Sequence, residues 1–236
     1  LNQGIVFNSL PKPIPMGSNE YYQHFFGIEI QTDRAYFDPN QLHLMDFAEA
    51  EEGVHFFYTL PFSENKALIE TTWISKKNRC TKKDYLNQVR DYVKDKLKID
   101  DYDIKFSEQG CLPLYHSSIK TGKNEILIGS SANLIRKSTG YAFLNIQNHS
   151  KFITNNLDSI LSISKFKLKS KYNFYDEILF RVIECNPTQM PEIFISMFSK
   201  NTDSLIKFLS SNSSLVDDFN AIMNLPKKYF LKALIR

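Results

Sequence analysis

Glu70 is the side chain whose setting in this sequence points most clearly to chemistry. It lies in the stretch 68–72 of an expected strand, shortly after the aromatic segment 56–63. Because alternate side chains of a strand share one face, Glu70 points the same way as Ile74, and Trp73 points the other way. If the Glu70 face is buried, desolvation raises the pKa of the carboxyl, as a general acid at neutral pH requires. The pattern leaves a second interpretation open, in which this face is in water and Trp73 anchors the core.

A second region joins a strand end to an expected helix start. The apolar strand predicted at 125–129 ends in the polar loop 130–139, and a helix is predicted to begin near Gly140. The start of a helix presents unpaired N–H groups and a positive dipole end, which suit an anion or an electron-rich ring. The alternative is that Ser138 and Thr139 only cap the helix.

The remaining polar groupings are less specific. Asp33, Asp38 and Asp46 lie near one another in the chain, but Asp-Pro turns and Asp-Arg surface pairs are common. The five histidines and three cysteines show no spacing typical of a metal site, and the sequence contains no Gly-x-Ser-x-Gly motif. We therefore expect neither metal-dependent hydrolysis nor serine-esterase chemistry.

Composition narrows the class of protein. The 236 residues are 42% hydrophobic and 14% aromatic, which suffices for a sizeable core. The 29 cationic residues are interspersed with 26 acidic ones, so the net charge of +3 gives no reason to expect nucleic acid as a partner. No apolar run reaches the roughly 20 residues that cross a bilayer, and Cys80, Cys111 and Cys185 form no disulfide pattern. These features favour a cytoplasmic protein.

The elements that must position these residues are a mainly antiparallel sheet and a series of helices. β-Branched and aromatic stretches predict strands at 23–31, 41–48, 53–62, 66–75 and 102–109. Thr81 and Asp84 predict a capped helix that lies across the sheet. Later in the chain, apolar side chains at helical spacing predict helices at 172–183, 190–199, 203–209, 215–224 and 227–235. The expected fold class is α+β.

Five short motifs follow one another at 32–39, 44–47, 56–63, 68–72 and 128–141. In this order they resemble the lycopene cyclase family, in particular the bacterial-type lycopene β-cyclases. That family carries Thr-Asp-Arg-Pro-x-Phe-Asp-Pro, Leu-Met-Asp-Phe, Phe-x-Tyr-x-Leu-Pro-Phe-Ser, Leu-x-Glu-x-Thr and, near the flavin, Ile-Gly-x-x-Gly-Gly leading into Pro-Ser-Thr-Gly-Tyr. The sequence departs from these motifs at Ala35, Ala132, Asn133 and Lys137. The family's N-terminal Rossmann segment with its Gly-x-Gly-x-x-Gly turn has no counterpart here, so we expect a C-terminal portion that is inactive alone.

The resemblance implies an FAD-dependent enzyme, an intramolecular lyase or isomerase that closes the ψ-ends of lycopene to β-rings without net oxidation. Reduced FAD would be the cofactor, with NAD(P)H as the electron source, and carotenoids the substrates. Glu70 would donate the proton, with Asp46 as a second candidate. The implied substrate-binding residues are Phe57, Tyr58, Phe62, Thr71 and Thr72. The implied flavin contacts are Gly129, Ser130, Ser131, Ser138, Thr139, Gly140 and Tyr141.

The resemblance also implies the organisation of a flavin hydroxylase-like substrate domain. Its segments would be a linker from the FAD-binding domain at 1–22, a substrate-binding sheet with its covering helix at 23–122, a flavin-contact segment at 123–165 and a helical subdomain at 166–236. Because lycopene dissolves in the bilayer, the helical tail could hold the enzyme peripherally on a membrane, or it could simply pack on the rest of the protein. Two rival functions stay open: a related FAD-dependent isoprenoid reductase or hydroxylase, and a non-catalytic isoprenoid-binding module.

Overall fold

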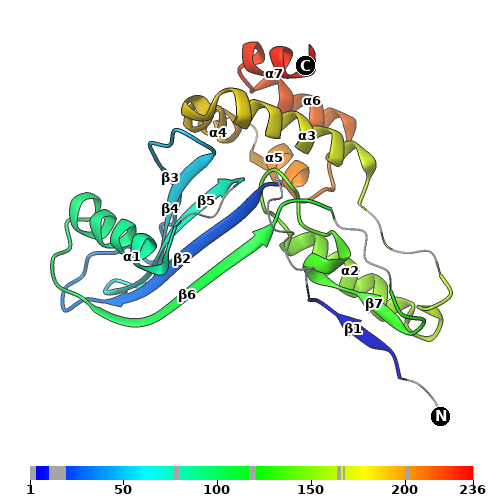
Figure 1. The fold of residues 1–236 in the computed structure, drawn as a ribbon, viewed down its shortest axis with the longest axis horizontal. Coiled ribbons are helices and arrows are strands. Elements are labelled where there is room, and N and C mark those ends of the chain that lie inside the picture. Colours follow the sequence, from blue (N-terminus) through cyan, green and yellow to red (C-terminus); the bar gives the residue numbers. More distant parts are fainter. Residues whose placement is uncertain are drawn as a thin grey trace. The chain divides into compact units, whose positions relative to one another are not determined.

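The chain folds into two compact units. The computed structural model describes residues 4–10, 20–76, 80–116, 121–163, 166, 168–199 and 202–235. One unit, here called the sheet unit, is Tyr21–Leu112, and the other, the helical unit, combines Leu1–Glu20 with Pro113–Arg236 (Figure 1). Much of the linker expected at 1–22 lies outside the described residues.

The sheet unit is built on a five-stranded sheet. Its strands lie in the order β3 (His43–Ala48), β4 (Val54–Ser63), β5 (Lys66–Ser75), β2 (Tyr22–Gln31) and β6 (Asp103–Pro113). The pairs β3–β4, β4–β5 and β5–β2 are antiparallel. The predicted strands are confirmed, although β6 continues to Pro113, beyond the predicted end at residue 109. With the helices described below, the fold is α+β.

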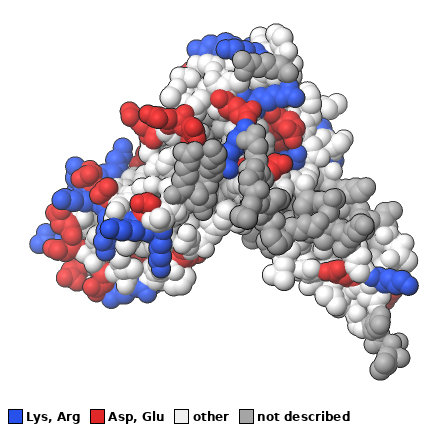
Figure 2. Space-filling model, viewed as in Figure 1, with Lys and Arg blue, Asp and Glu red and all other residues white. Residues whose placement is uncertain are grey.

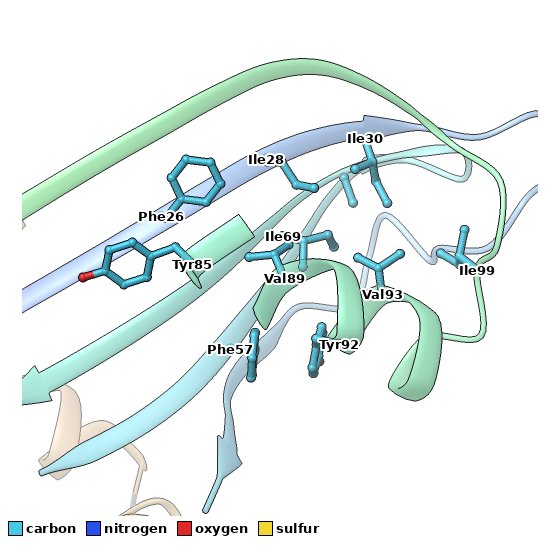
Figure 3. Close-up of a cluster of buried hydrophobic side chains, with 11 residues drawn as sticks. Phe26, Ile28, Ile30, Phe57, Ile69, Tyr85, Val89, Tyr92, Val93 and Ile99 are labelled. Atoms are coloured by element: carbon cyan, nitrogen blue, oxygen red, sulfur yellow. The ribbon is translucent and has the colours of Figure 1, made fainter. Parts of the chain in front are cut away.

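One face of the sheet is covered by α1 (Lys82–Asp91), which continues as a π-helical turn at Tyr92–Lys96. The predicted capping box is confirmed, because Thr81 and Asp84 bond each other's backbone N–H groups. Phe57 of β4 stacks on Tyr92 with ring centroids 4.2 Å apart. Figure 3 shows the core between helix and sheet, which is formed by Phe26, Ile28, Ile30, Phe57, Ala67, Ile69, Tyr85, Val89, Tyr92, Val93 and Ile99.

The opposite side of α1 faces water. Lys, Arg, Asp and Glu side chains are interspersed over this helix (Figure 2), and its exposed positions include Lys82, Lys83, Arg90 and Asp91. This division into an apolar and a charged face explains why the segment forms a surface helix on the sheet.

Two histidines are buried on the α1 face. The ring nitrogens of His24 bond the hydroxyls of Tyr85 (2.5 Å) and Ser75 (2.8 Å), and His55 Nε2 bonds the Thr71 hydroxyl (2.8 Å). Burial lowers the pKa of His24 to about 4. Burial also lowers the pKa of His55 to about 4, and His24 adds a smaller effect. Both imidazoles are therefore neutral near pH 7.

The helical unit begins with a short parallel pair, β1 (Val6–Asn8) and β7 (Glu125–Leu127), followed by a 3₁₀ turn at Gly129–Ala132. Its helices are α2 (Phe143–Asn155), α3 (Ser170–Cys185), α4 (Met190–Phe198), α5 (Thr202–Leu209), α6 (Leu215–Met223) and α7 (Lys227–Ile235), with 3₁₀ turns at Leu157–Ser159 and Pro187–Gln189. The five helices predicted from residue 172 onward are confirmed within a few residues. No helix among the described residues has the length and apolarity needed to cross a bilayer.

Two predicted boundaries in this unit are wrong. The strand predicted to reach Gly129 ends at Leu127, because Gly129 adopts a left-handed backbone with φ of 60° and opens the 3₁₀ turn. The helix predicted near Gly140 begins at Phe143. Residues 136–141 instead form a closed turn, in which Gly140, with φ of 70°, donates to the Arg136 carbonyl and Arg136 N donates to the Tyr141 carbonyl.

Candidate active site

Glu70 lies at the centre of the sheet, on the face opposite α1. The strand register pairs it with Gly27 of β2 on one side and with Tyr58 of β4 on the other. The Thr72 hydroxyl, two residues along the same face, donates a 2.6 Å hydrogen bond to Glu70 Oε1. The alternation predicted for β5 is confirmed, because Ile69 and Thr71 are buried on the α1 side while Glu70 faces away from it.

The missing side chain of Gly27 makes room for two larger residues beside Glu70. A Cβ atom at Gly27 would stand 3.1 Å from Leu68 Cδ1, 3.4 Å from Glu108 Cγ and 3.5 Å from Glu108 Oε1. The Glu108 side chain, which comes from β6, therefore crosses over Gly27 on the same face as Glu70. The sheet thus brings two carboxyl groups together from strands that are far apart in the sequence.

This environment changes the acidity of Glu70. Burial raises the pKa of the Glu70 carboxyl to about 7, the hydrogen bond from Thr72 opposes the rise, and the charge of Glu108 adds to it. A carboxyl group with this pKa holds a proton near neutral pH and can deliver it, as a general acid must. The second interpretation is right about Trp73, which packs against the core, but a Glu70 face in water does not agree with this half-buried position.

Tyr58 completes the polar part of this face. Burial raises the pKa of its hydroxyl to about 12, with a smaller contribution from the charge of Glu70. The phenol therefore stays protonated and presents an aromatic ring and a hydroxyl beside the carboxyl.

The structure divides the predicted substrate-binding residues between different places. Tyr58 and Thr72 share the face of Glu70. Phe57 and Thr71 lie on the opposite face, where Phe57 packs in the core and the Thr71 hydroxyl donates to Gln88 Oε1 of α1 at 2.8 Å. Phe62 lies near the end of the β4–β5 hairpin with 58% of its surface exposed.

Asp46, the second predicted acid, is not beside Glu70. It pairs across the strands with Phe57 and so faces α1, where its Oδ2 accepts a 2.9 Å hydrogen bond from the Tyr92 hydroxyl. Lys96 approaches its other oxygen at 4.0 Å. The two candidate acids therefore lie on opposite faces of one sheet.

The predicted flavin-contact residues all lie in the helical unit. The Ser131 hydroxyl donates to the Asn8 carbonyl at 2.6 Å and lies 2.8 Å from the Ile128 carbonyl, so it ties the 3₁₀ turn to β1. The Ser130 hydroxyl reaches the Ser9 carbonyl at 3.5 Å. The Thr139 oxygen accepts from the Tyr141 N–H at 3.4 Å.

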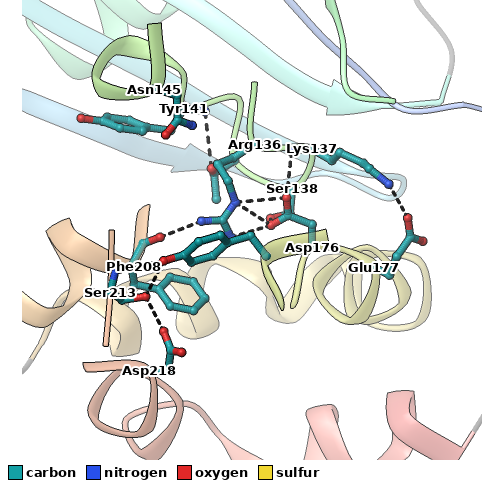
Figure 4. A network of polar contacts seen from close by, with 12 residues as sticks. Arg136, Lys137, Ser138, Tyr141, Asn145, Asp176, Glu177, Phe208, Ser213 and Asp218 are labelled. Carbon is teal, nitrogen blue, oxygen red and sulfur yellow. Dashed lines mark hydrogen bonds and ion pairs between the residues drawn. The ribbon is translucent and has the colours of Figure 1, made fainter. Parts of the chain in front are cut away.

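A buried ion pair holds the second half of this segment. The Arg136 guanidinium binds both carboxylate oxygens of Asp176 on α3, with its closest contact at 2.7 Å, and donates to the Phe208 carbonyl at 2.7 Å (Figure 4). The Ser138 hydroxyl donates to the same Asp176 carboxylate at 2.8 Å. Arg136 and Asp176 are only 1% and 2% exposed. Because a buried charge without its partner is strongly unfavourable, this pair fixes the turn at 136–141 against α3.

The start of α2 has no side-chain cap. The N-cap residue of α2 is Ala142, which offers no side-chain hydrogen bond to the first turn of the helix. The prediction that Ser138 and Thr139 only cap this helix is therefore wrong, because the Ser138 hydroxyl is directed to Asp176 and the helix begins later. The first N–H groups of α2 are suited to an electron-rich acceptor.

Sequence reasoning did not single out Gly27, Glu108 or Arg136. The signal for Gly27 was available, because a glycine inside a strand often marks a close approach by another group. Glu108 and Arg136 gave no local signal, since each acquires its role from a partner on a distant element. Among the described residues, no group of His, Cys, Asp and Glu could hold a metal ion.

Comparison with known proteins identifies the family. No curated protein matches the chain. A solved structure, that of a geranylgeranyl bacteriochlorophyll reductase-like protein from Thermoplasma acidophilum, is similar with 15% identity and a TM-score of 0.46, over 91% of this chain and 54% of that protein. The chain thus spans about half the length of that protein. The family model described as lycopene cyclase protein matches residues 2–234. This match covers nearly the whole sequence, and the chain belongs to the lycopene cyclase family.

Proposed function

We propose that this chain carries the acid of a lycopene β-cyclase and that Glu70 is that acid. The observation that supports the assignment is the half-buried Glu70 carboxyl, whose pKa of about 7 lets it hold a proton at neutral pH. Its neighbours include the aromatic ring of Tyr58 on one adjacent strand and the apolar side chain of Leu68, with Glu108 reaching over Gly27. The aromatic and apolar part of this face can contact a hydrocarbon polyene.

In the proposed reaction, Glu70 protonates C2 of a ψ-end of lycopene. The C5=C6 double bond then attacks the resulting cation, and loss of a proton from C6 leaves the β-ring. One proton enters and one leaves, so the reaction is redox-neutral. The Thr72 hydroxyl stabilises the Glu70 carboxylate that remains after proton transfer, because it donates to that oxygen at 2.6 Å.

We assign the flavin contacts to the helical unit, at the start of α2 and the turn before it. The N-terminus of α2 has no side-chain cap, and its positive dipole end suits an electron-rich ring system, whereas the hydroxyls of Ser131 and Ser138 are directed to partners within the chain. Backbone N–H groups, rather than these hydroxyls, would therefore bind the cofactor. Reduced FAD, when bound, supplies an electron-rich surface that stabilises developing positive charge.

We propose that the protein reaches its substrate by resting on the membrane through α6. The outward side of this short helix is apolar and exposed. On its inward side, Asp218 binds Lys171 at 2.6 Å. Lys227 and Lys228 follow at the start of α7, where they can meet anionic headgroups. The exposed apolar residues of α6 are Leu215, Val216, Phe219, Ile222 and Met223.

Pigment analysis tests the proposed reaction. Lycopene-accumulating cells that express the complete gene should form β-carotene, and Glu70→Gln should reduce its formation by about a hundredfold or more, as loss of a general acid does. Glu64→Gln, which makes the same change in the exposed turn of the same hairpin, should leave the product unchanged. Unchanged lycopene with the wild-type gene, or full activity of Glu70→Gln, would contradict the proposal. A reduced or hydroxylated isoprenoid would favour the related flavoprotein function instead.

A further inference from the structure

We infer that Glu108 is a positioning residue for the proposed acid, and that it holds the proton on Glu70 by placing a second carboxylate beside it across Gly27. The inference rests on the proposed role of Glu70 and extends it to a residue outside the five motifs described above. It concerns how the site is kept in its working protonation state.

Gly27 provides the space in which the two carboxyl groups approach each other. This residue is the direct cross-strand neighbour of Glu70 in the β2–β5 pair, so the two share one face of the sheet. The Glu108 side chain occupies the space over Gly27, since its Cγ and Oε1 lie 3.4 and 3.5 Å from the position of a Cβ atom there. Any larger residue at this position would compete with Glu108 for that space.

A second glycine lies on the strand that carries Glu108, where it leaves space for the Phe25 ring. A Cβ atom at Gly110 would stand 2.4 Å from the Phe25 ring, so a larger residue there would require this ring to shift. Phe25 and Gly27 are two residues apart on β2 and both lie on the Glu70 face of the sheet. Two glycines on neighbouring strands therefore shape the space in which the Glu108 side chain lies.

The other charged groups on this face do not replace Glu108. On β4 the neighbour of Glu70 is Tyr58, which is neutral because its pKa is raised to about 12. On β2 the nearest carboxylate is Glu29, which is paired with Lys66 of β5 at 2.8 Å. Glu108 is the carboxylate that contributes to the raised pKa of Glu70, after the larger effect of burial. A like charge nearby disfavours ionisation, so Glu70 keeps its proton to higher pH.

Direct titration of Glu70 tests the inference. Purified protein containing glutamate labelled with ¹³C at the side-chain carboxyl is titrated by NMR, and the Glu70 signal is identified by its loss in Glu70→Gln. Glu108→Gln should lower the pKa of Glu70 by about half a unit or more, and Glu108→Lys should lower it further. Glu64→Gln serves as the control and should leave this pKa unchanged.

An electrostatic role predicts that the pKa of Glu70 falls from wild type to Glu108→Gln and again to Glu108→Lys. A purely structural role does not predict this order, because the order follows the charge at position 108. The alkaline limb of the pH–activity profile should move to lower pH in the same order. An unchanged Glu70 pKa in Glu108→Gln and Glu108→Lys would overturn the inference and leave the proposed cyclase intact. Full cyclase activity of Glu70→Gln would instead overturn the proposed function, even if the titration responded to Glu108.

Discussion

Replacing Glu70 by glutamine removes a charge that the folded protein accommodates poorly. The carboxyl has an ordinary pKa of 4.5 and a folded-state pKa of about 7, with burial as the largest cause. A carboxyl whose pKa is raised by folding keeps its proton in the folded state while the unfolded chain already loses it. The free energy of unfolding therefore decreases as the pH rises from about 4.5 to about 7 and is constant above that window. Glutamine abolishes this dependence and can still accept the hydrogen bond from Thr72.

The size of the effect follows from the two pKa values. One pKa unit corresponds to about 1.4 kcal/mol, so the difference between 4.5 and about 7 sets an upper limit of about 3 kcal/mol. Glu70 is only half-buried, and water screens part of its charge. We therefore expect the free energy of unfolding of Glu70→Gln, relative to that of wild type, to increase by about 1–2 kcal/mol from pH 5 to pH 8.5.

The chain offers a specific probe for this measurement. Trp73 is its one tryptophan and lies in β5, three residues after Glu70. Urea unfolding followed by Trp73 fluorescence at pH 5 and pH 8.5 reports on the sheet unit, and Glu64→Gln in the exposed turn is the matched control. Comparing variant with wild type at each pH cancels the contributions of other titrating groups. An equal stability difference at the two pH values would refute the raised pKa and, with it, the reason for assigning Glu70 as the acid.

Three further predictions concern other parts of the structure. Asp176→Asn should destabilise the helical unit by about 3–5 kcal/mol, because it leaves Arg136 buried without its counter-charge; circular dichroism should show the loss, and an unchanged melting temperature would contradict it. Between pH 6.5 and about 4 the unfolded chain gains protons that the folded sheet unit refuses at His24 and His55, so His55→Gln should lose less stability than wild type as the pH falls through this window; equal losses by Trp73 fluorescence would argue against buried neutral histidines. Phe219→Asp should weaken flotation with anionic liposomes about tenfold or more, and undiminished flotation would rule out α6 as the membrane contact.

Local patterns in the sequence determined most of the elements. Strand alternation placed Glu70 and Trp73 on opposite faces, Thr81 and Asp84 marked the start of α1, and apolar spacing located the helices from α3 to α7. These features depend on residues a few positions apart, so their physical causes are contained within short windows. The family motifs added Glu70 as a candidate, which alternation alone left as a possible surface residue.

The tertiary structure decided what surrounds the candidate site. The sequence does not tell which face of the sheet α1 covers. In the structure α1 covers the face of Asp46, Phe57 and Thr71, and Glu70 lies on the other face. The Glu108 side chain approaches Glu70 because β6 lies beside β2, and Arg136 binds Asp176 because α3 lies against a turn formed earlier in the chain. These contacts depend on the pairing of distant segments, which no short window of sequence encodes, and they control the desolvation and charge that give a carboxyl its acidity.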